Sequence, residues 1–306
     1  MPPEAARIVV SEFMDEAALA PLGPGVLYDP TLVDDRPRLL ASLGAAEAVI
    51  VRNRTRVDTD LLDAAPRLRA VGRLGVGLDN IDVAACEARG VSVHPATGAN
   101  ALSVAEYVIG AALHLVRGTF EATTEVIGGE WPRGRLGGGG EIAGRTMGLV
   151  GYGQIARMVG ERARALGMDV IATDPAAPDF AEAREASLEE LLGGADVVSL
   201  HVPLVADTKH LIDRAALARM RPGAVLINTA RGGVVDEGAL CAALREGRVA
   251  GAALDVFEDE PLGAATAERF RGLPVLLTPH VAGVTAEGNR RVSAVTVENV
   301  RRALAG

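Results

Sequence analysis

The stretch from Thr146 to Thr173 constrains the fold more than any other part of the chain. An apolar run, a glycine-rich turn, a helix-compatible segment and a second apolar run follow one another there. Two parallel strands need a crossover connection between them, and that connection is usually a helix. The stretch therefore predicts a βαβ unit and, with it, an α/β fold built on a parallel sheet.

The glycine turn of this unit has the spacing of a dinucleotide-binding turn. Gly151 permits the tight turn, Gly153 lets a pyrophosphate approach the backbone, and the small Ala156 lets the helix pack closely on the strand. The backbone N–H groups at the helix start, at Gln154 and Ile155, would then face the phosphates. A tight glycine turn without a ligand is the alternative interpretation.

Asp174 follows the second strand of the unit, where a carboxylate can accept hydrogen bonds from the adenosine ribose. The same carboxylate would repel a 2′-phosphate, so the sequence favours NAD over NADP. The preceding strand, the following helix and this acid together favour a dinucleotide site over an empty turn.

Strand and helix candidates alternate on both sides of this unit, which predicts a second parallel sheet. We expect two doubly wound α/β domains, with a Rossmann-type cofactor domain (98–283) inserted in a smaller flavodoxin-like substrate domain (1–97 and 284–306). A final helix at about 285–304 is expected to return to the smaller domain. Hinges are expected near residues 97 and 284.

Composition excludes several classes of protein. Lys and Arg total 31 against 40 Asp and Glu, and a net charge of −9 argues against a nucleic-acid surface. No basic segment leads into an apolar signal sequence, and the most apolar run is too short to span a membrane. Cys86 and Cys241 predict buried free thiols in a reducing cytoplasm.

Two segments near the start of the larger domain carry local signals. Ser103 and Glu106 have the spacing of a capping box that would begin a long apolar helix, ending at about Arg117 and packing between domains or subunits. The segment 128–141 is expected to be irregular. Its four consecutive glycines do not predict a phosphate loop, because no strand precedes them.

Three polar motifs follow predicted strands of the larger domain: NTARGGVVDE, AALDVFEDEP and LTPHVAGVT. Together with GLVGYGQIA they resemble the D-isomer-specific 2-hydroxyacid dehydrogenases, the family of phosphoglycerate dehydrogenase. The resemblance covers nearly the whole chain. It implies reversible hydride transfer between NAD(H) and a small 2-hydroxy or 2-keto acid.

The resemblance also implies three catalytic roles. His280 would exchange the proton at the substrate oxygen, since imidazole titrates near neutral pH. Glu260 would hold the other ring nitrogen, and Arg231 would bind the substrate carboxylate through its fork of donors. Taken singly, each is as readily a surface or structural residue. The other histidines show no metal-ligand spacing, so no metal is expected.

Further cofactor contacts are implied by position in the motifs. The resemblance places Asp255 near the nicotinamide carboxamide, and His201 ends a strand where it could equally serve packing. The cofactor-binding positions are Gly151, Gly153, Gln154, Ile155, Asp174, His201, Val202, Pro203, Thr208, Thr229, Ala230, Asp255 and Gly283.

The smaller domain is expected to carry substrate recognition. By resemblance, the backbone N–H groups of Val76 and Gly77 bind the substrate carboxylate, and Arg52, Asn53 and Arg54 form the other substrate loop. Two arginines in a net acidic protein suggest a dianionic substrate. A solvated basic turn is the alternative.

The motifs VRNRT, RLGVGLDNID and PATGANALSVAEYV refine the substrate. Within the family they are most similar to members acting on a three-carbon acid with a sulfonate, which makes (S)-sulfolactate and sulfopyruvate the first candidates. 3-Phosphoglycerate and glyoxylate or hydroxypyruvate remain alternatives, as does an NAD-sensing binding protein similar to the C-terminal-binding corepressors. The family's usual arrangement implies a homodimer.

Overall fold

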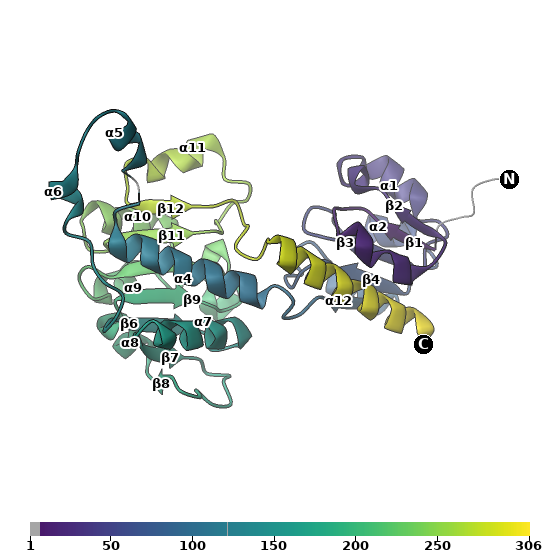
Figure 1. Cartoon of the computed structure of the whole chain (residues 1–306). Helices are drawn as coiled ribbons and strands as arrows, with labels where there is room; N and C mark the ends of the chain where they lie inside the picture. Colours follow the sequence, from purple (N-terminus) through teal and green to yellow (C-terminus); the bar gives the residue numbers. More distant parts are fainter. Residues whose placement is uncertain (1–6, 121) are drawn as a thin grey trace. The chain divides into compact units, whose positions relative to one another are not determined.

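The computed structural model describes residues 7–120 and 122–306, which form two compact units (Figure 1). The first unit contains the described residues up to Asn100 together with Val284–Gly306, and the second unit is Ala101–Gly283. The second unit is therefore inserted between two segments of the first.

The first unit is built on a five-stranded parallel sheet in the order β2-β1-β3-β4-β5. This is the flavodoxin-like strand order. The strands are β1 (Ile8–Val10), β2 (Val26–Tyr28), β3 (Ala48–Val51), β4 (Ala70–Arg73) and β5 (Ser92–Pro95).

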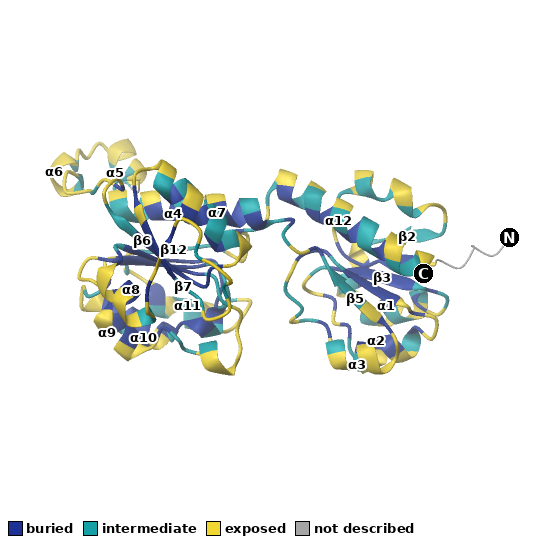
Figure 2. Cartoon of the chain, turned by 90° about the horizontal axis from the view of Figure 1, so that it is seen from below, coloured by how far each residue is buried: buried dark blue, intermediate teal, exposed yellow. Residues whose placement is uncertain are grey.

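Helices cover both faces of this sheet (Figure 2). One face carries α1 (Arg36–Ser42), α2 (Thr59–Ala64) and α3 (Val83–Ala88), which bury leucine and valine side chains against β3 and β4. The other face is covered by α12 (Ala286–Ala305), with Val292, Val297 and Val300 buried against the sheet. Short 3-10 turns, η1 (Glu16–Ala18), η2 (Ala20–Leu22) and η3 (Pro30–Asp34), connect the first strands.

The second unit is built on a seven-stranded parallel sheet in the order β12-β11-β10-β9-β6-β7-β8. Six of these strands have the Rossmann order, and β12 extends it by one. The strands are β6 (Thr146–Val150), β7 (Asp169–Thr173), β8 (Arg184–Glu185), β9 (Val197–Leu200), β10 (Val225–Asn228), β11 (Gly251–Leu254) and β12 (Val275–Leu277).

Each face of this sheet has its own core. On one face α4 (Ala101–Arg117) packs on α7 (Gln154–Ala165), and small residues of both helices are buried there. On the other face α8 (Leu188–Gly194), α9 (Arg214–Arg219) and α10 (Glu237–Arg245) form the second core. The remaining short helices are α5 (Thr123–Ile127), α6 (Arg133–Leu136), α11 (Ala264–Ala267), η4 (Ala206–Thr208), η5 (Gly232–Val234) and η6 (Glu268–Phe270).

The predicted fold class is confirmed, and two local predictions are wrong. The helix α4 begins at Ala101, so Ser103 lies inside it and cannot be its N-cap. The segment 128–141 is not wholly irregular, because Arg133–Leu136 forms a helical turn. Cys86 and Cys241 are buried free thiols, as predicted, and burial raises the pKa of both. Within the described residues, no helix has the length and apolar character needed to cross a membrane.

Candidate active site

Three neighbouring strands of the second unit direct their C-terminal ends to one edge of the sheet. β10, β11 and β12 are adjacent and parallel, and Figure 1 labels β11 and β12 next to each other. Arg231 follows β10, Glu260 follows β11 and His280 follows β12. Because carboxyl ends of parallel strands meet at one edge, the fold brings the three predicted catalytic residues together there.

The turn after β10 is shaped by Asn228, a buried residue. Its Oδ1 accepts a hydrogen bond from Ala230 N at 3.0 Å, and its Nδ2 donates to Arg231 O at 2.9 Å. Gly232 then lets this turn contact the one after β11, since an added Cβ would lie 1.8 Å from the carbonyl carbon of Phe257. The approach of these two turns fixes Arg231 relative to the segment that carries Glu260.

The turn that carries His280 is organised by Asp255, which is 1% exposed. Its Oδ1 accepts hydrogen bonds from Thr278 Oγ1 and Val281 N, and its Oδ2 accepts one from Ala282 N at 2.8 Å. The backbone carbonyl of Asp255 also accepts from His280 N at 2.8 Å. His280 itself has a φ of 57°, in the left-handed region that non-glycine residues seldom occupy. Asp255 therefore holds the backbone that presents the imidazole.

His280 and Glu260 form a close pair. His280 Nδ1 lies 2.7 Å from Glu260 Oε2, and Glu260 Oε1 accepts a hydrogen bond from Phe257 N at 3.0 Å. Burial alone would raise the pKa of Glu260, but the hydrogen bonds from His280 and Phe257 and the nearby charge of Arg231 lower it. Glu260 is thus ionised at neutral pH, so His280 carries its Nδ1 hydrogen toward it and Nε2 is left for chemistry.

Arg231 lies close enough to Glu260 to lower the pKa of that carboxyl. Its Nη1 donates a hydrogen bond to Ala230 O at 2.7 Å, which holds the guanidinium against its own turn. The arrangement provides a fixed cation beside an imidazole with a defined tautomer. Such a pair can bind a carboxylate and exchange a proton at a neighbouring oxygen.

The glycine turn between β6 and α7 has the features of a phosphate cradle. Gly151 has a φ of 88°, and a Cβ there would lie 2.7 Å from His201 O, so the position requires glycine. A Cβ on Gly153 would meet nothing within 4 Å, and no side chain caps this end of α7. The helix start is therefore open to an anion, and Gln154 and Ile155 begin its first turn.

Asp174 lies beside this turn at the end of β7. Its Oδ2 accepts a hydrogen bond from Tyr152 N at 2.7 Å, and its Oδ1 accepts one from Ala176 N at 2.8 Å. Each carboxylate oxygen can accept a further hydrogen bond, since each has two lone pairs. The acid thus supports the glycine turn and can still receive ribose hydroxyls.

The other predicted cofactor residues lie at the ends of β9, β10 and β12. His201 Nε2 is 3.0 Å from Ser199 Oγ, and burial lowers the pKa of His201 to about 4, so the ring is neutral. Thr208 Oγ1 accepts from Val205 N at 2.8 Å and so closes the loop after β9, which also contains Val202 and Pro203. Gly283 is the last residue of this unit.

Thr229 follows β10 directly, and its hydroxyl is buried without a hydrogen-bond partner among the described residues. An unpaired buried hydroxyl costs free energy unless a ligand satisfies it. Together with the open helix start and the acid at the end of β7, this orphan hydroxyl fits a dinucleotide bound along this edge of the sheet. No group of three residues with metal-binding side chains occurs in the described chain.

The predicted substrate loops lie in the first unit. They differ in how many of their hydrogen-bond donors already have a partner within the described residues. Arg52 Nη2 donates to Asn289 Oδ1 on α12 at 2.9 Å, and burial lowers the pKa of Arg52. Arg54 is 59% exposed and forms an ion pair with Asp34, which is 64% exposed. The backbone N–H of Asn53 donates a hydrogen bond to Glu12 Oε2 at 3.4 Å.

In the second loop, the N–H groups of Val76 and Gly77 donate no hydrogen bond within the described residues. Gly75, with a φ of 142°, packs against the guanidinium of Arg73. The backbone of this loop therefore has two donors available for an anion.

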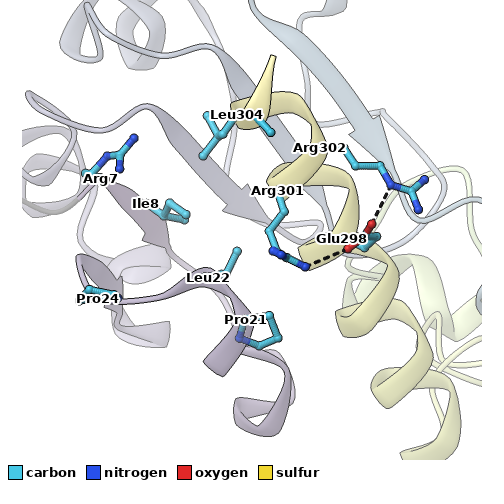
Figure 3. Close-up of a pocket in the computed structure, with 10 residues that line it drawn as sticks. Arg7, Ile8, Pro21, Leu22, Pro24, Glu298, Arg301, Arg302 and Leu304 are labelled. Carbon is cyan, nitrogen blue, oxygen red and sulfur yellow. Dashed lines mark hydrogen bonds and ion pairs between the residues drawn. The ribbon is translucent and has the colours of Figure 1, made fainter.

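A cavity of about 440 Å³ opens elsewhere in the first unit, between the start of β1, η2 and the C-terminal end of α12 (Figure 3). Its charged lining is already paired, because Arg301 and Arg302 both contact Glu298. None of the predicted site residues lines it. Its size therefore does not identify the active site.

The sequence motifs did not single out several residues that build the site. Asn228 and Gly232 shape the arginine turn, and Tyr107 extends the Asp255 network, with its hydroxyl 2.6 Å from Thr278 Oγ1. Asn228 and Gly232 flank Arg231 within NTARGG, so their position was the available signal. Tyr107 lies on α4, far away in sequence, and no local signal marks it.

The chain is similar to known proteins in both sequence and fold. Residues 109–282 match the family model described as D-isomer specific 2-hydroxyacid dehydrogenase, NAD binding domain. The chain is 56% identical to (S)-sulfolactate dehydrogenase of Chromohalobacter salexigens over 97% of its own length and 98% of that protein.

More distant relatives share the same sequence or fold. D-3-phosphoglycerate dehydrogenase of Mycobacterium leprae is 41% identical over 98% of this chain, which spans 57% of that longer protein. The crystal structure of the TT0316 protein from Thermus thermophilus has a TM-score of 0.90 at 34% identity. That match covers 98% of this chain and 97% of the other.

Proposed function

The chain belongs to the D-isomer-specific 2-hydroxyacid dehydrogenase family, an NAD-dependent group of oxidoreductases, and we propose that it interconverts (S)-sulfolactate and sulfopyruvate. The pairing of His280 with Glu260 beside Arg231 carries the catalytic part of this proposal. The substrate rests on two supports, the 56% identical relative and the exposed Arg54 in the predicted substrate loop.

The catalytic steps follow from the geometry. When bound, NADH supplies the hydride that reduces the keto carbon. Arg231 binds the substrate carboxylate and polarises the adjacent carbonyl. His280 donates its Nε2 proton to the carbonyl oxygen, so hydride and proton together convert the ketone into the alcohol. Glu260 stabilises the imidazolium before this transfer, and in the reverse direction His280 accepts the proton of the alcohol.

The cofactor would lie along the carboxyl edge of the seven-stranded sheet. We assign the pyrophosphate to the N–H groups of Gln154 and Ile155, which follow Gly153, and the ribose hydroxyls to Asp174. The orphan hydroxyl of Thr229 would gain a partner on this edge. The remaining predicted contacts, His201, Val202, Pro203, Thr208, Ala230, Asp255 and Gly283, belong to the same proposal.

The second anion of the substrate is assigned to Arg54. Its present partner is an exposed carboxylate, and an exposed ion pair contributes less than about 1 kcal/mol, so a substrate anion can displace it. Arg52 and Asn53 complete this loop, and the N–H groups of Val76 and Gly77 would receive the substrate carboxylate. 3-Phosphoglycerate, a dianion of similar length, is the second candidate, supported by the phosphoglycerate dehydrogenase relatives.

The stereochemical label agrees with a D-specific enzyme. Replacing the methyl group of D-lactate by CH2SO3 changes the priority order of the substituents. The same spatial arrangement therefore receives the label S, and one site geometry serves both acids.

Substitution of Arg231 by Ala tests the catalytic proposal. We expect NADH-dependent reduction of sulfopyruvate to fall by a factor of about 1000 or more, because removal of a positioned charge costs several kcal/mol in the transition state. Thermal unfolding and NADH binding should match those of the control Arg219→Ala, a surface arginine of the same unit. Retention of most activity in Arg231→Ala would refute the assignment.

We also propose a homodimer formed through the segment from α4 to α6. Phe120, Ile127 and Trp131 are 63%, 81% and 77% exposed in this segment, and grouped apolar exposure marks an interaction surface. Helices α5 and α6 are largely exposed (Figure 2). Ile127→Asp combined with Trp131→Asp should halve the mass measured by light scattering. Leu166→Asp, at the exposed C-cap of α7, should leave this mass unchanged. A monomeric wild-type protein would contradict this interface.

A reducing cytoplasm is proposed from the two buried free thiols.

A further inference from the structure

Glu12 is a charged residue in an unusual position, two residues after the end of β1 and only 4% exposed. A carboxylate buried to this degree costs free energy unless hydrogen bonds satisfy its oxygens. It is absent from the catalytic and binding assignments made above. The hydrogen-bond partners of Glu12 therefore indicate the role of this buried charge.

Both carboxylate oxygens of Glu12 accept hydrogen bonds from the backbone of the loop that follows β3. Oε1 accepts from Arg52 N at 2.8 Å and from Thr55 N at 2.9 Å. Oε2 accepts from Asn53 N at 3.4 Å and from Arg54 N at 3.2 Å. One side chain thus gathers four successive N–H groups, which makes the backbone wrap around the carboxylate.

The same loop is tied to the second substrate loop. Thr55, 3% exposed, accepts a hydrogen bond on its carbonyl from Asn80 Nδ2 at 2.6 Å, and its hydroxyl lies 3.0 Å from Ser11 Oγ. Val57 N donates to Asn80 O at 2.9 Å, and Val57 pairs with Ile81 as an isolated bridge. The two loops are therefore held in register by Asn80 and by the bridge between Val57 and Ile81.

We propose that Glu12 is a positioning residue for substrate selectivity. Its carboxylate sets the backbone from Arg52 to Thr55, and Asn80 joins this loop to the loop that contains Val76 and Gly77. Glu12 does not touch the substrate, and its influence on the second anion passes through Arg54. This inference rests on the proposed function, since it concerns how that enzyme selects a dianionic acid.

The alternative role for Glu12 is general stability, because a buried negative charge beside two arginines also favours the compact turn. The loop carries two arginines close together, and their repulsion opposes a compact turn. A buried negative charge at the centre of the turn offsets this repulsion, which a neutral acceptor would not do. The positive charge on Arg52 in turn stabilises the buried carboxylate.

Glu12→Gln separates these roles because it is nearly isosteric. The remaining oxygen of the amide can keep the two shorter hydrogen bonds, from Arg52 N and Thr55 N, while its NH2 group faces the N–H groups of Asn53 and Arg54. Donors that face one another cannot bond, so this part of the backbone is released. KM for sulfopyruvate should rise about tenfold, while KM for pyruvate and the affinity for NADH change less than about twofold.

Arg54→Leu provides the coupling test. If Glu12 acts through Arg54, Glu12→Gln should add less than about twofold to KM for sulfopyruvate in the Arg54→Leu background. Glu47→Gln is the matched control, because Glu47 is a carboxylate of the same unit that pairs with Arg7. Equal KM changes for the two acids, no change for either, or the same effect with and without Arg54 would overturn the inference.

If Glu12→Gln does not fold, a second variant tests the same connection between the loops. Asn80→Ala removes the hydrogen bond to Thr55 O and should give the same selective rise in KM for sulfopyruvate, with thermal unfolding measured alongside. An Asn80→Ala enzyme that treats both acids as the wild type does would count against the inference. A wild-type protein that reduces neither acid would overturn the proposed function as well, whereas an active wild type with indifferent variants overturns only the role of Glu12.

Discussion

Gly232 occupies a position with no room for a side chain, which yields a quantitative prediction. A Cβ at this residue would lie 1.8 Å from the carbonyl carbon of Phe257, 1.9 Å from its oxygen and 2.4 Å from Glu258 N. All three atoms are backbone, so no side-chain rotation can relieve the overlap. Gly232→Ala therefore has to separate the turn after β10 from the turn after β11.

The size of that separation follows from ordinary contact distances. To reach 3.4 Å from the nearest atom, the two turns must part by about 1.6 Å. Gly232 follows Arg231 directly, and Phe257 hydrogen-bonds Glu260, so this shift misplaces the arginine relative to the His280–Glu260 pair. A misplacement of about 1 Å in a catalytic site can cost about 100-fold in rate, and overpacking costs about 1–3 kcal/mol of stability.

Steady-state kinetics with sulfopyruvate and NADH, together with thermal unfolding and NADH titration, measure these effects. Gly232→Ala should lower kcat/KM by about 100-fold or more and still bind NADH through the turn after β6. The matched control is Gly233→Ala, whose added Cβ would meet only the side chain of Leu204, at 3.2 Å, and that side chain can move. Activity of Gly232→Ala within about fivefold of Gly233→Ala would refute the reasoning.

Two further predictions concern the cofactor edge. Asp174→Ala should narrow the preference for NADH over NADPH by about tenfold or more, because the charge that repels a 2′-phosphate is gone. The control Asp169→Ala, at the other end of β7, should leave the ratio of kcat/KM with NADH to kcat/KM with NADPH as in the wild type. If this ratio does not change in Asp174→Ala, the role assigned to the acid is wrong. His201, with its pKa lowered from 6.5 to about 4, contributes stability that is complete above pH 6.5 and is lost as pH falls toward 4, because only the unfolded chain takes up the proton there. The loss in free energy of unfolding is at most about 3 kcal/mol. Urea unfolding between pH 6.5 and pH 4 should show a smaller loss in His201→Asn than in the wild type. An equal dependence of the free energy of unfolding on pH in the two proteins would contradict the lowered pKa of His201.

The sequence predicts the fold well where periodicity and glycine spacing act locally. Both parallel sheets follow from alternating strands and helices. Position 151 requires a glycine, because its φ is positive and the backbone of His201 leaves no room for a Cβ. The sequence does not predict β2 and β8, because three and two residues show no periodicity. Strand pairing, not local preference, makes them strands.

The two Ser-x-x-Glu patterns show why local signals are not sufficient. Ser187 and Glu190 form a capping box, because the strand β8 ends just before them and the helix has to begin there. Ser103 and Glu106 have the same spacing, but the turn at 97–100 ends earlier and the helix starts at Ala101. The preceding backbone decides which serine becomes a cap.

The catalytic residues could be predicted from their motifs, but the groups that hold them could not. Asp255 lies in a recognisable motif, yet its hydrogen bonds to Thr278, Val281 and Ala282 depend on the adjacency of β11 and β12. Glu12 is forty residues away from the loop that it organises. Contacts of this kind arise from tertiary packing, for which a single sequence carries no spacing rule.

The central claim is most directly tested by the relative efficiency with which the purified protein reduces sulfopyruvate and pyruvate with NADH. The wild type should prefer sulfopyruvate, and Arg54→Leu should lower kcat/KM for sulfopyruvate about tenfold or more while changing that for pyruvate less than about twofold. Arg38→Leu, which removes a comparably exposed arginine of the same unit, should alter neither value. Absence of NADH-dependent reduction, or equal losses for both acids in Arg54→Leu, would contradict the account.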